Sequence, residues 1–282
     1  MIDGARDHYI TLDGLRFHYR EWGDATRPPL VILHGFTMHA HDFDRVASLL
    51  AATHRVLVLD QRGHGETDWA PDYAARCWVR DVAAFADALA LARFALAGHS
   101  LGGLYAVLFA ARYPARVSRL IVEDVGPLAP EALDGSVACE IFADPEEMVR
   151  AVLPFDPDAD EDQWRHHVRH TLIPRAEGGW ERRWDRALRQ PGPHELLPPI
   201  DEQWAALRSI ACPALVMRGE RSSFTHQLLE ATAEALPKGR YVEIPHSRHN
   251  IHWGNPAAFV DAIRDFLSEE AAGAPRERRR RE

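Results

Sequence analysis

A serine stands between two glycines in a pattern that suits nucleophilic chemistry. Gly98-His99-Ser100-Leu101-Gly102 directly follows the apolar residues 94–97, and residues 101–113, ended by Pro114, have the pattern of a helix. A G-x-S-x-G sequence between a strand and a helix is typical of a sharp turn with an exposed serine at its apex, where glycines avoid backbone clashes. This order predicts that Ser100 is a nucleophile.

A serine hydroxyl is a weak nucleophile until a histidine takes its proton and an acid orients that histidine. His246, His249 and His252 all lie in one late loop, after the apolar residues 241–244. Asn255-Pro256 then opens the last helix as its N-cap and first-turn proline. The loop therefore predicts a proton acceptor, and the residues alone leave three candidates for it.

Two carboxylates are candidates for the acid, and each ends an apolar strand. Asp124 follows residues 120–122, and Glu220 follows residues 214–217. Neighbouring parallel strands end at the same edge of a sheet, so both positions can reach one imidazole. We favour Asp124, because the chain between it and Ser100 suffices for a helix and one returning strand. Glu220 is the alternative acid, and otherwise a solvated or loop-bracing carboxylate.

The chain resembles the α/β-hydrolase family, in its capped serine esterase or lactonase branch, from a first hairpin to the last helix. His34-Gly35-Phe36, after the apolar residues 30–33, looks like the H-G-x loop of that family, and residues 60–65 resemble its D-x-R-G-x-G loop. The histidine of the family aligns with His249, where Arg248 replaces the usual glycine. Many members carry the acid after the seventh strand, at a position that Ser223 occupies here, and this favours Asp124.

The resemblance implies cleavage of a carboxylic ester or lactone of a small, largely apolar substrate through an acyl-enzyme, without a cofactor. Ser100 would attack, His249 would carry the proton, and Asp124 would fix the imidazole tautomer. The backbone N–H groups of Phe36 and Leu101 would form the oxyanion hole. The turn at Ser100 corresponds to the nucleophile elbow of this family. A serine at the elbow disfavours the epoxide-hydrolase and haloalkane-dehalogenase branches, which use aspartate there.

Two other functions stay open on the same residues. Hydrolysis of a carbon–carbon bond in a ketone uses the same triad, so the sequence does not separate it from ester or lactone cleavage. A non-catalytic ligand receptor on the same fold is the alternative of another class. A complete triad disfavours the receptor, and slow single-turnover kinetics would reveal it.

Composition narrows the class of protein. The 282 residues suffice for one sizeable core, and 46% of them are hydrophobic. The net charge of −9 argues against a nucleic-acid partner. No apolar run approaches the roughly 20 residues of a membrane span, and the first residues lack the pattern of a signal peptide. We therefore expect a cytoplasmic protein with a small-molecule substrate and no membrane partner, and a homo-oligomer stays open.

The hydrophobic pattern predicts an α/β fold. The resemblance implies a mostly parallel, eight-stranded α/β-hydrolase sheet flanked by helices. Residues 8–12 and 15–21, around Asp13-Gly14, predict a hairpin at its antiparallel edge. Strands and helices then alternate until the rhythm stops near Gly126 and resumes at Ala214. We expect a core at 1–127 and 210–270, a helical cap at 128–209 inserted after the sixth strand, and a solvated tail at 271–282.

The expected cap is rich in aromatic residues, which could line a pocket for an apolar substrate. They are Phe142, Phe155, Trp164, Trp180, Trp184 and Trp204. Trp184, Arg183 and the core residue His34 are candidate substrate contacts. His166, His167 and His170 do not predict a metal site, because only 166 and 170 share a helix face and no carboxylate partner is specified.

Overall fold

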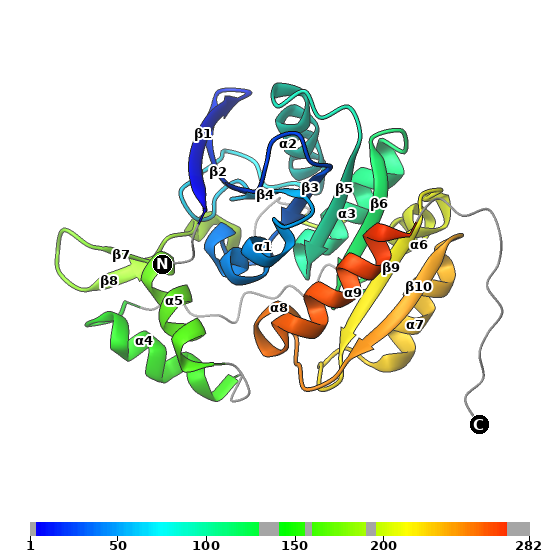
Figure 1. Ribbon diagram of the computed structural model, residues 1–282. Coiled ribbons are helices and arrows are strands. Elements are labelled where there is room, and N and C mark those ends of the chain that lie inside the picture. Colours follow the sequence, from blue (N-terminus) through cyan, green and yellow to red (C-terminus); the bar gives the residue numbers. More distant parts are fainter. Residues whose placement is uncertain (1–3, 130–140, 156–159, 190–195, 270–282) are drawn as a thin grey trace.

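An eight-stranded sheet forms the centre of the molecule (Figure 1). The computed structural model describes residues 4–129, 141–155, 160–189 and 196–269. The strand order is β1-β2-β4-β3-β5-β6-β9-β10. The strands are β1 (Arg6–Leu12), β2 (Leu15–Trp22), β3 (Pro29–Leu33), β4 (Arg55–Leu59), β5 (Phe94–His99), β6 (Val117–Glu123), β9 (Ala214–Gly219) and β10 (Gly239–Ile244). Strand β2 is antiparallel to β1 and β4, and the other neighbours are parallel, which confirms the predicted sheet.

Helices cover both faces of this sheet. The helices are α1 (Asp44–Leu50), α2 (Ala75–Ala88), α3 (Leu101–Arg112), α4 (Pro145–Val152), α5 (Glu161–Thr171), α6 (Ile200–Ser209), α7 (His226–Ala235), α8 (Ile251–Gly254) and α9 (Pro256–Ser268). Apolar side chains of α1 and α9 pack on one face, and those of α2, α3, α6 and α7 pack on the other. Parallel strands buried on both faces explain why their sequences are continuous apolar runs. No helix among the described ranges is both long and apolar enough to cross a membrane.

Local sequence signals predicted several elements correctly. The hairpin of β1 and β2 turns at Asp13 and Gly14, which have φ angles of 49° and 84°. Positive φ at both central residues of a two-residue turn gives the twist that a hairpin requires. Asp144 accepts a hydrogen bond from the Glu147 N–H and caps α4, and the Asn255 side chain caps α9 in the same way. Each of these signals acts within a few residues and so can be identified in the sequence.

The segment expected to form the cap divides into two parts in the structure. Helices α4 and α5 lie together with a short hairpin, β7 (Leu172–Pro174) and β8 (Trp180–Arg182), at the lower left of Figure 1. Helix α6 instead packs against α3, and its Leu207 belongs to the main core. The hairpin corrects the expectation of helices alone, since strands of three residues are too short to show alternation. Residues 130–140, the Phe155 side chain and the expected tail at 271–282 lie outside the described residues.

The 60–65 loop, which resembles the D-x-R-G-x-G loop of the family, is held by a buried ion pair. Arg62 donates from Nε to Asp81 Oδ2 at 2.6 Å and from Nη2 to Asp81 Oδ1 at 2.5 Å. The two side chains are 2% and 5% exposed. A planar guanidinium that binds both oxygens of a carboxylate fixes the loop in direction as well as in position.

Arg62→Met should lower the free energy of unfolding by about 3–5 kcal/mol, because it leaves the Asp81 carboxylate buried without its partner. Urea denaturation followed by far-UV circular dichroism measures this change. Arg76→Met is the matched control: Arg76 pairs with Asp72 at the surface, where such a pair contributes about 0–1 kcal/mol. Equal losses in the two variants would contradict a structural role for the buried pair.

Candidate active site

Ser100 lies at the apex of the turn between β5 and α3, with φ 51° and ψ −124°. A non-glycine residue in this region is strained, and such strain is held only where the surrounding structure fixes it. The flanking glycines permit the turn. A Cβ on Gly98 would lie 2.3 Å from the Gly102 carbonyl oxygen, and one on Gly102 would lie 2.4 Å from the His34 carbonyl oxygen. The turn therefore holds the serine hydroxyl away from the sheet, as the motif predicts.

The Ser100, His249 and Asp124 side chains form one chain of hydrogen-bonding contacts. Ser100 Oγ lies 3.0 Å from His249 Nε2, and His249 Nδ1 lies 2.8 Å from Asp124 Oδ2. A carboxylate accepts, so Nδ1 carries the imidazole proton and Nε2 is left to accept from the serine hydroxyl. The arrangement can thus take a proton from Ser100 and place it on a ring whose orientation is held.

Asp124 reaches this position from the carboxyl end of β6, beside β9. Its side chain is 0% exposed. Besides the His249 ring, its Oδ1 accepts from the Gly219 N–H at 3.0 Å and its Oδ2 accepts from the Ser222 hydroxyl at 2.6 Å. These donors satisfy the carboxylate and keep it aimed at the histidine, since a buried charge is tolerated only when it is hydrogen-bonded.

Sequence reasoning missed the role of Ser222. It compared Ser223 with the acid position of related chains, but Ser223 is exposed and the hydroxyl that contacts Asp124 belongs to the residue before it. The available signal was a pair of serines just beyond β9, at the same sheet edge as Asp124. Which of two adjacent residues points inward depends on the local turn and is not visible in the sequence.

Glu220, the alternative acid, lies away from His249. Its carboxylate accepts from the backbone N–H of His246 at 2.8 Å, and its side chain is 46% exposed. Glu220 thus braces the loop after β10. Of the three candidate histidines, His246 is 76% exposed and His252 is buried, and only His249 contacts Ser100.

Two buried contacts behind His249 hold its loop, and the sequence did not reveal them. Glu123 Oε1 accepts from the His252 backbone N–H at 3.1 Å and lies 2.7 Å from His252 Nδ1. His99 Nε2 lies 3.1 Å from the His249 carbonyl oxygen, and burial holds the pKa of His99 well below its usual range. A neutral His99 ring that donates from Nε2 therefore anchors the His249 backbone. The residues next to Ser100 and Asp124 thus support the loop that carries the histidine.

The two expected oxyanion donors lie on either side of this turn. Leu101 is the first residue of α3, and the N–H groups of a first helical turn have no partner within the helix. Phe36 follows Gly35, where a Cβ would lie 2.6 Å from His99 Nδ1, so the loop approaches the elbow closely. The Phe36 ring packs edge-on against His64, with ring centroids 5.9 Å apart. Both backbones therefore border the turn that carries Ser100.

His34, a candidate substrate contact, is completely buried and braces the loop instead. Its Nε2 accepts from the Gln61 N–H at 3.0 Å, so its Nδ1 carries the proton and donates to the Gly35 carbonyl at 2.8 Å. Gln61 Nε2 in turn donates to the His34 carbonyl at 2.6 Å. With both ring nitrogens bonded to the protein, His34 is not available to bind a substrate.

Trp184 and Arg183 come from the residues that follow β8. Trp184 is 2% exposed and packs into the main core, and its backbone pairs with His64 next to Phe36. Arg183 is half-buried and forms an ion pair with Glu66 at 2.9 Å. Trp184 thus lies in the wall beside the site, and Arg183 ties this segment to Glu66, just after the 60–65 loop.

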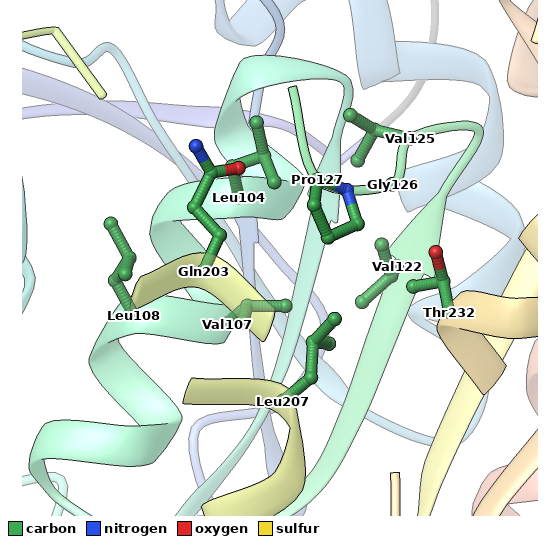
Figure 2. A pocket seen from close by; sticks show the side chains of 10 residues that line it. All are labelled: Leu104, Val107, Leu108, Val122, Val125, Gly126, Pro127, Gln203, Leu207 and Thr232. Carbon is green, nitrogen blue, oxygen red and sulfur yellow. The ribbon is translucent and has the colours of Figure 1, made fainter. Parts of the chain in front are cut away.

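An apolar pocket lies between α3, β6, α6 and α7, close to the residues that follow Asp124 (Figure 2). Leu104, Val125, Pro127 and Leu207 line it. About 10 Å³ is open to the centre of a water molecule, which is room for a single water. The pocket is therefore a packing gap beside the site and is too small for a substrate.

Comparisons with known proteins agree with this fold. The family model described as alpha/beta hydrolase fold matches residues 28–256. A 3-hydroxybutyrate-oligomer hydrolase of Cupriavidus necator is 28% identical, covering 89% of this chain and 92% of its own. A 2-(acetamidomethylene)succinate hydrolase of Mesorhizobium japonicum is 27% identical, covering 94% and 98%. The crystal structure of an alpha/beta hydrolase from Novosphingobium aromaticivorans has a TM-score of 0.79 at 31% identity, covering 93% of this chain and 98% of that one.

These relatives are hydrolases, and they support a general hydrolase activity for this chain. The family match extends over most of the sequence and includes Ser100, Asp124 and His249. With its sheet order, its elbow and this match, the chain belongs to the α/β-hydrolase fold family.

Proposed function

We propose that this protein is a serine hydrolase that cleaves a carboxylic ester or lactone of a small, largely apolar substrate through an acyl-enzyme. One observation carries the proposal: the hydrogen-bonded chain from Ser100 Oγ through His249 to the buried Asp124 carboxylate. This arrangement activates a hydroxyl for attack on an acyl carbon. The relatives named as hydrolases support the reaction class.

In the first half of the reaction, Ser100 Oγ bonds to the acyl carbon while its proton passes to His249 Nε2. The carbonyl oxygen becomes an oxyanion, which accepts hydrogen bonds from the backbone N–H groups of Leu101 and Phe36. Asp124 remains ionised and stabilises the imidazolium. The intermediate then expels the alkoxide, which takes the proton from His249 and leaves the acyl group on Ser100.

In the second half, water attacks the acyl-enzyme. His249 Nε2 accepts a proton from this water, and a second oxyanion forms in the same place. Its collapse breaks the bond to Ser100, which recovers its proton from His249. Water is the only other reactant that these steps require, and the acid product carries its oxygen.

We also propose that the part of the expected cap that excludes α6, described at residues 141–155 and 160–189, acts as a cap over this site. Its contacts with the core support the assignment: the Asp185 carboxylate accepts from the Tyr73 hydroxyl at 2.6 Å, and His39 Nε2 lies 3.0 Å from Thr171 Oγ1. Both contacts join the segment to loops at the carboxyl edge of the sheet, where substrates of open α/β sheets bind. Trp184, near Phe36, is then a wall of the acyl pocket.

A substrate panel tests the proposed chemistry. It contains p-nitrophenyl esters of increasing acyl length, simple lactones, 3-hydroxybutyrate oligomers and a vinylogous diketone. Multiple turnover of short esters or lactones, with an acyl adduct on Ser100 by mass spectrometry, is the expected result. Faster cleavage of the diketone would favour a carbon–carbon hydrolase, and a single turnover with every compound would favour a receptor.

Ser222→Ala should lower kcat by roughly 10-fold and leave KM little changed, because the Asp124 carboxylate loses a hydroxyl donor. A hydrogen bond to a charged group contributes about 1.5–3 kcal/mol, and part of this orients the carboxylate. Steady-state kinetics measure the change. Ser223→Ala, at the exposed neighbour, is the matched control, and Ser222→Thr should recover most of the rate. A Ser222→Thr variant as slow as Ser222→Ala would show that the hydroxyl does not position Asp124.

A further inference from the structure

Three histidine side chains meet where α5 packs against the 3-10 helix η1 (Ala40–Phe43). These two helices are far apart in the sequence. His41 comes from η1, and His166 and His170 lie one turn apart on α5, on the same face. Nitrogen atoms of the three rings lie within 4.8 Å of one another. The ring centroids of His41 and His170 are 3.5 Å apart, and those of His166 and His170 are 5.0 Å apart. We call these three residues the α5 histidine cluster.

A carboxylate borders this cluster. Asp44 Oδ2 lies 3.0 Å from His166 Nε2 and 3.2 Å from His41 Nδ1. As a hydrogen-bond acceptor, Asp44 orients these two rings, as carboxylates do beside metal-bound histidines. The other oxygen of Asp44 accepts from Arg20, so Oδ2 is the oxygen that faces the histidines.

Arg20 is the cationic side chain in contact with this group, and its charge is already compensated. Its Nη1 lies 2.8 Å from His41 Nδ1, and its Nε donates to Asp7 at 2.7 Å. Asp44 supplies the negative charge opposite the guanidinium, and Asp7 is shared between Arg20 and His18.

The packing of α5 on η1 does not depend on the cluster itself. His167 Nδ1 lies 2.7 Å from Asp42 Oδ1, and these buried side chains join the two helices beneath the cluster. A scaffold held by other contacts can present three imidazoles without an ion, and such preorganisation is what a metal site requires.

The cluster is also accessible to solvent, and one of its rings is not engaged in a hydrogen bond. The side chains of His41 and His166 are 12% and 23% exposed, so an ion can enter from solvent. Within the ranges that the structure describes, the ring of His170 makes no hydrogen bond. An imidazole without a hydrogen-bonding partner in a partly buried position is a ready ligand.

Two other groups of histidines and carboxylates lie within the described parts of the chain, and they differ from the α5 histidine cluster in exposure to solvent. These are His39–Asp42–His167 and His99–Glu123–His252. All six side chains are buried, and the carboxylate of each group contacts a histidine ring of its own group at 2.7 Å. Both groups are closed to solvent, so the α5 histidine cluster is the one suited to an ion from solvent.

We propose that His41, His166 and His170 bind a divalent transition-metal ion, with zinc as the best match. Three imidazoles favour zinc or its neighbours over magnesium and calcium, which prefer all-oxygen sites. The ion joins α5 to η1. It lies outside the Ser100 site, so the proposal does not depend on the proposed function.

Zinc titration of the full, untagged chain after treatment with a chelator tests this site. Calorimetry should give one equivalent of zinc, and zinc should raise the thermal midpoint of the wild-type protein by mass action. His170→Ala should weaken binding by more than about 100-fold, since even the loss of an outer partner of a metal ligand costs 10–100-fold. Because His170 makes no hydrogen bond, this variant should keep the metal-free thermal midpoint of the wild type.

Two control variants, each lacking a histidine outside the cluster, test whether zinc binding is specific to the cluster. His226→Ala removes an exposed histidine on α7 and should bind zinc as the wild type does. His249→Ala removes the histidine that contacts Ser100 and should also retain the zinc-dependent rise in thermal midpoint. Wild-type affinity in His170→Ala, no zinc binding by the wild type, or loss of binding only in His249→Ala would each overturn the proposal.

Discussion

Ser100→Ala should leave the protein folded and lower kcat by about 10⁵-fold or more, because no other group replaces the bond between Ser100 Oγ and the acyl carbon. Removing the nucleophile of a serine protease costs on the order of 10⁶ in kcat, and the remaining rate comes from binding and the oxyanion hole. The variant should also lose covalent labelling by an organophosphonate. Kinetics, intact-mass spectrometry and a thermal melt measure these effects on the same sample.

Ser209→Ala is the matched control, since Ser209 is an exposed serine near the end of α6 and its hydroxyl donates to the Ala206 carbonyl. This control should be labelled and turn over like the wild type. Labelling of Ser222 in the Ser100→Ala protein, with activity retained, would move the nucleophile to the next strand end and refute the assignment.

Asp124→Asn should lower kcat on the order of 10⁴-fold with little change in fold, as the equivalent change does in serine proteases. An amide is close in shape to the carboxylate, so it can keep contacts with the Gly219 N–H and the Ser222 hydroxyl. It presents an NH₂ group to His249 Nδ1, which then favours the tautomer with its proton on Nε2. That tautomer cannot accept the proton of Ser100.

Glu220→Gln tests the other carboxylate. Glu220 bonds to the His246 backbone at a partly exposed position, so its change should lower kcat less than about 10-fold, as expected for a surface contact. The double variant shows whether one carboxylate partly rescues the loss of the other. If Glu220→Gln were the slower enzyme while still folded, the acid would belong after β9 and the choice of Asp124 would be wrong.

Elements with local signals could be predicted from the sequence. The elbow at Ser100 requires glycine at both sides and a strand before it, and these features are contiguous. The hairpin at Asp13 and Gly14 and the cap of α9 at Asn255 are equally local. The contact of Asp124 with His249 follows from another general rule, because neighbouring parallel strands end at one edge.

Contacts that depend on the packing of distant elements could not be predicted. The Ser222 hydroxyl and the His252 ring reach β6 carboxylates only after β9 and the 246–252 loop are in place. The sequence showed no carboxylate for His166 and His170, because Asp44 is 122 residues away from His166 in the chain and meets it only across the α5 contact. Helix α6 likewise resembles a cap helix in sequence, and only its packing on α3 assigns it to the main core.

Because β6 pairs with β9, the ends of both strands meet at the Asp124 carboxylate. Asp124 extends from the end of β6, yet it accepts hydrogen bonds from Gly219 and Ser222 at the end of β9. In this chain β6 supplies the acid, and the end of β9 supplies the N–H and the hydroxyl that orient its carboxylate.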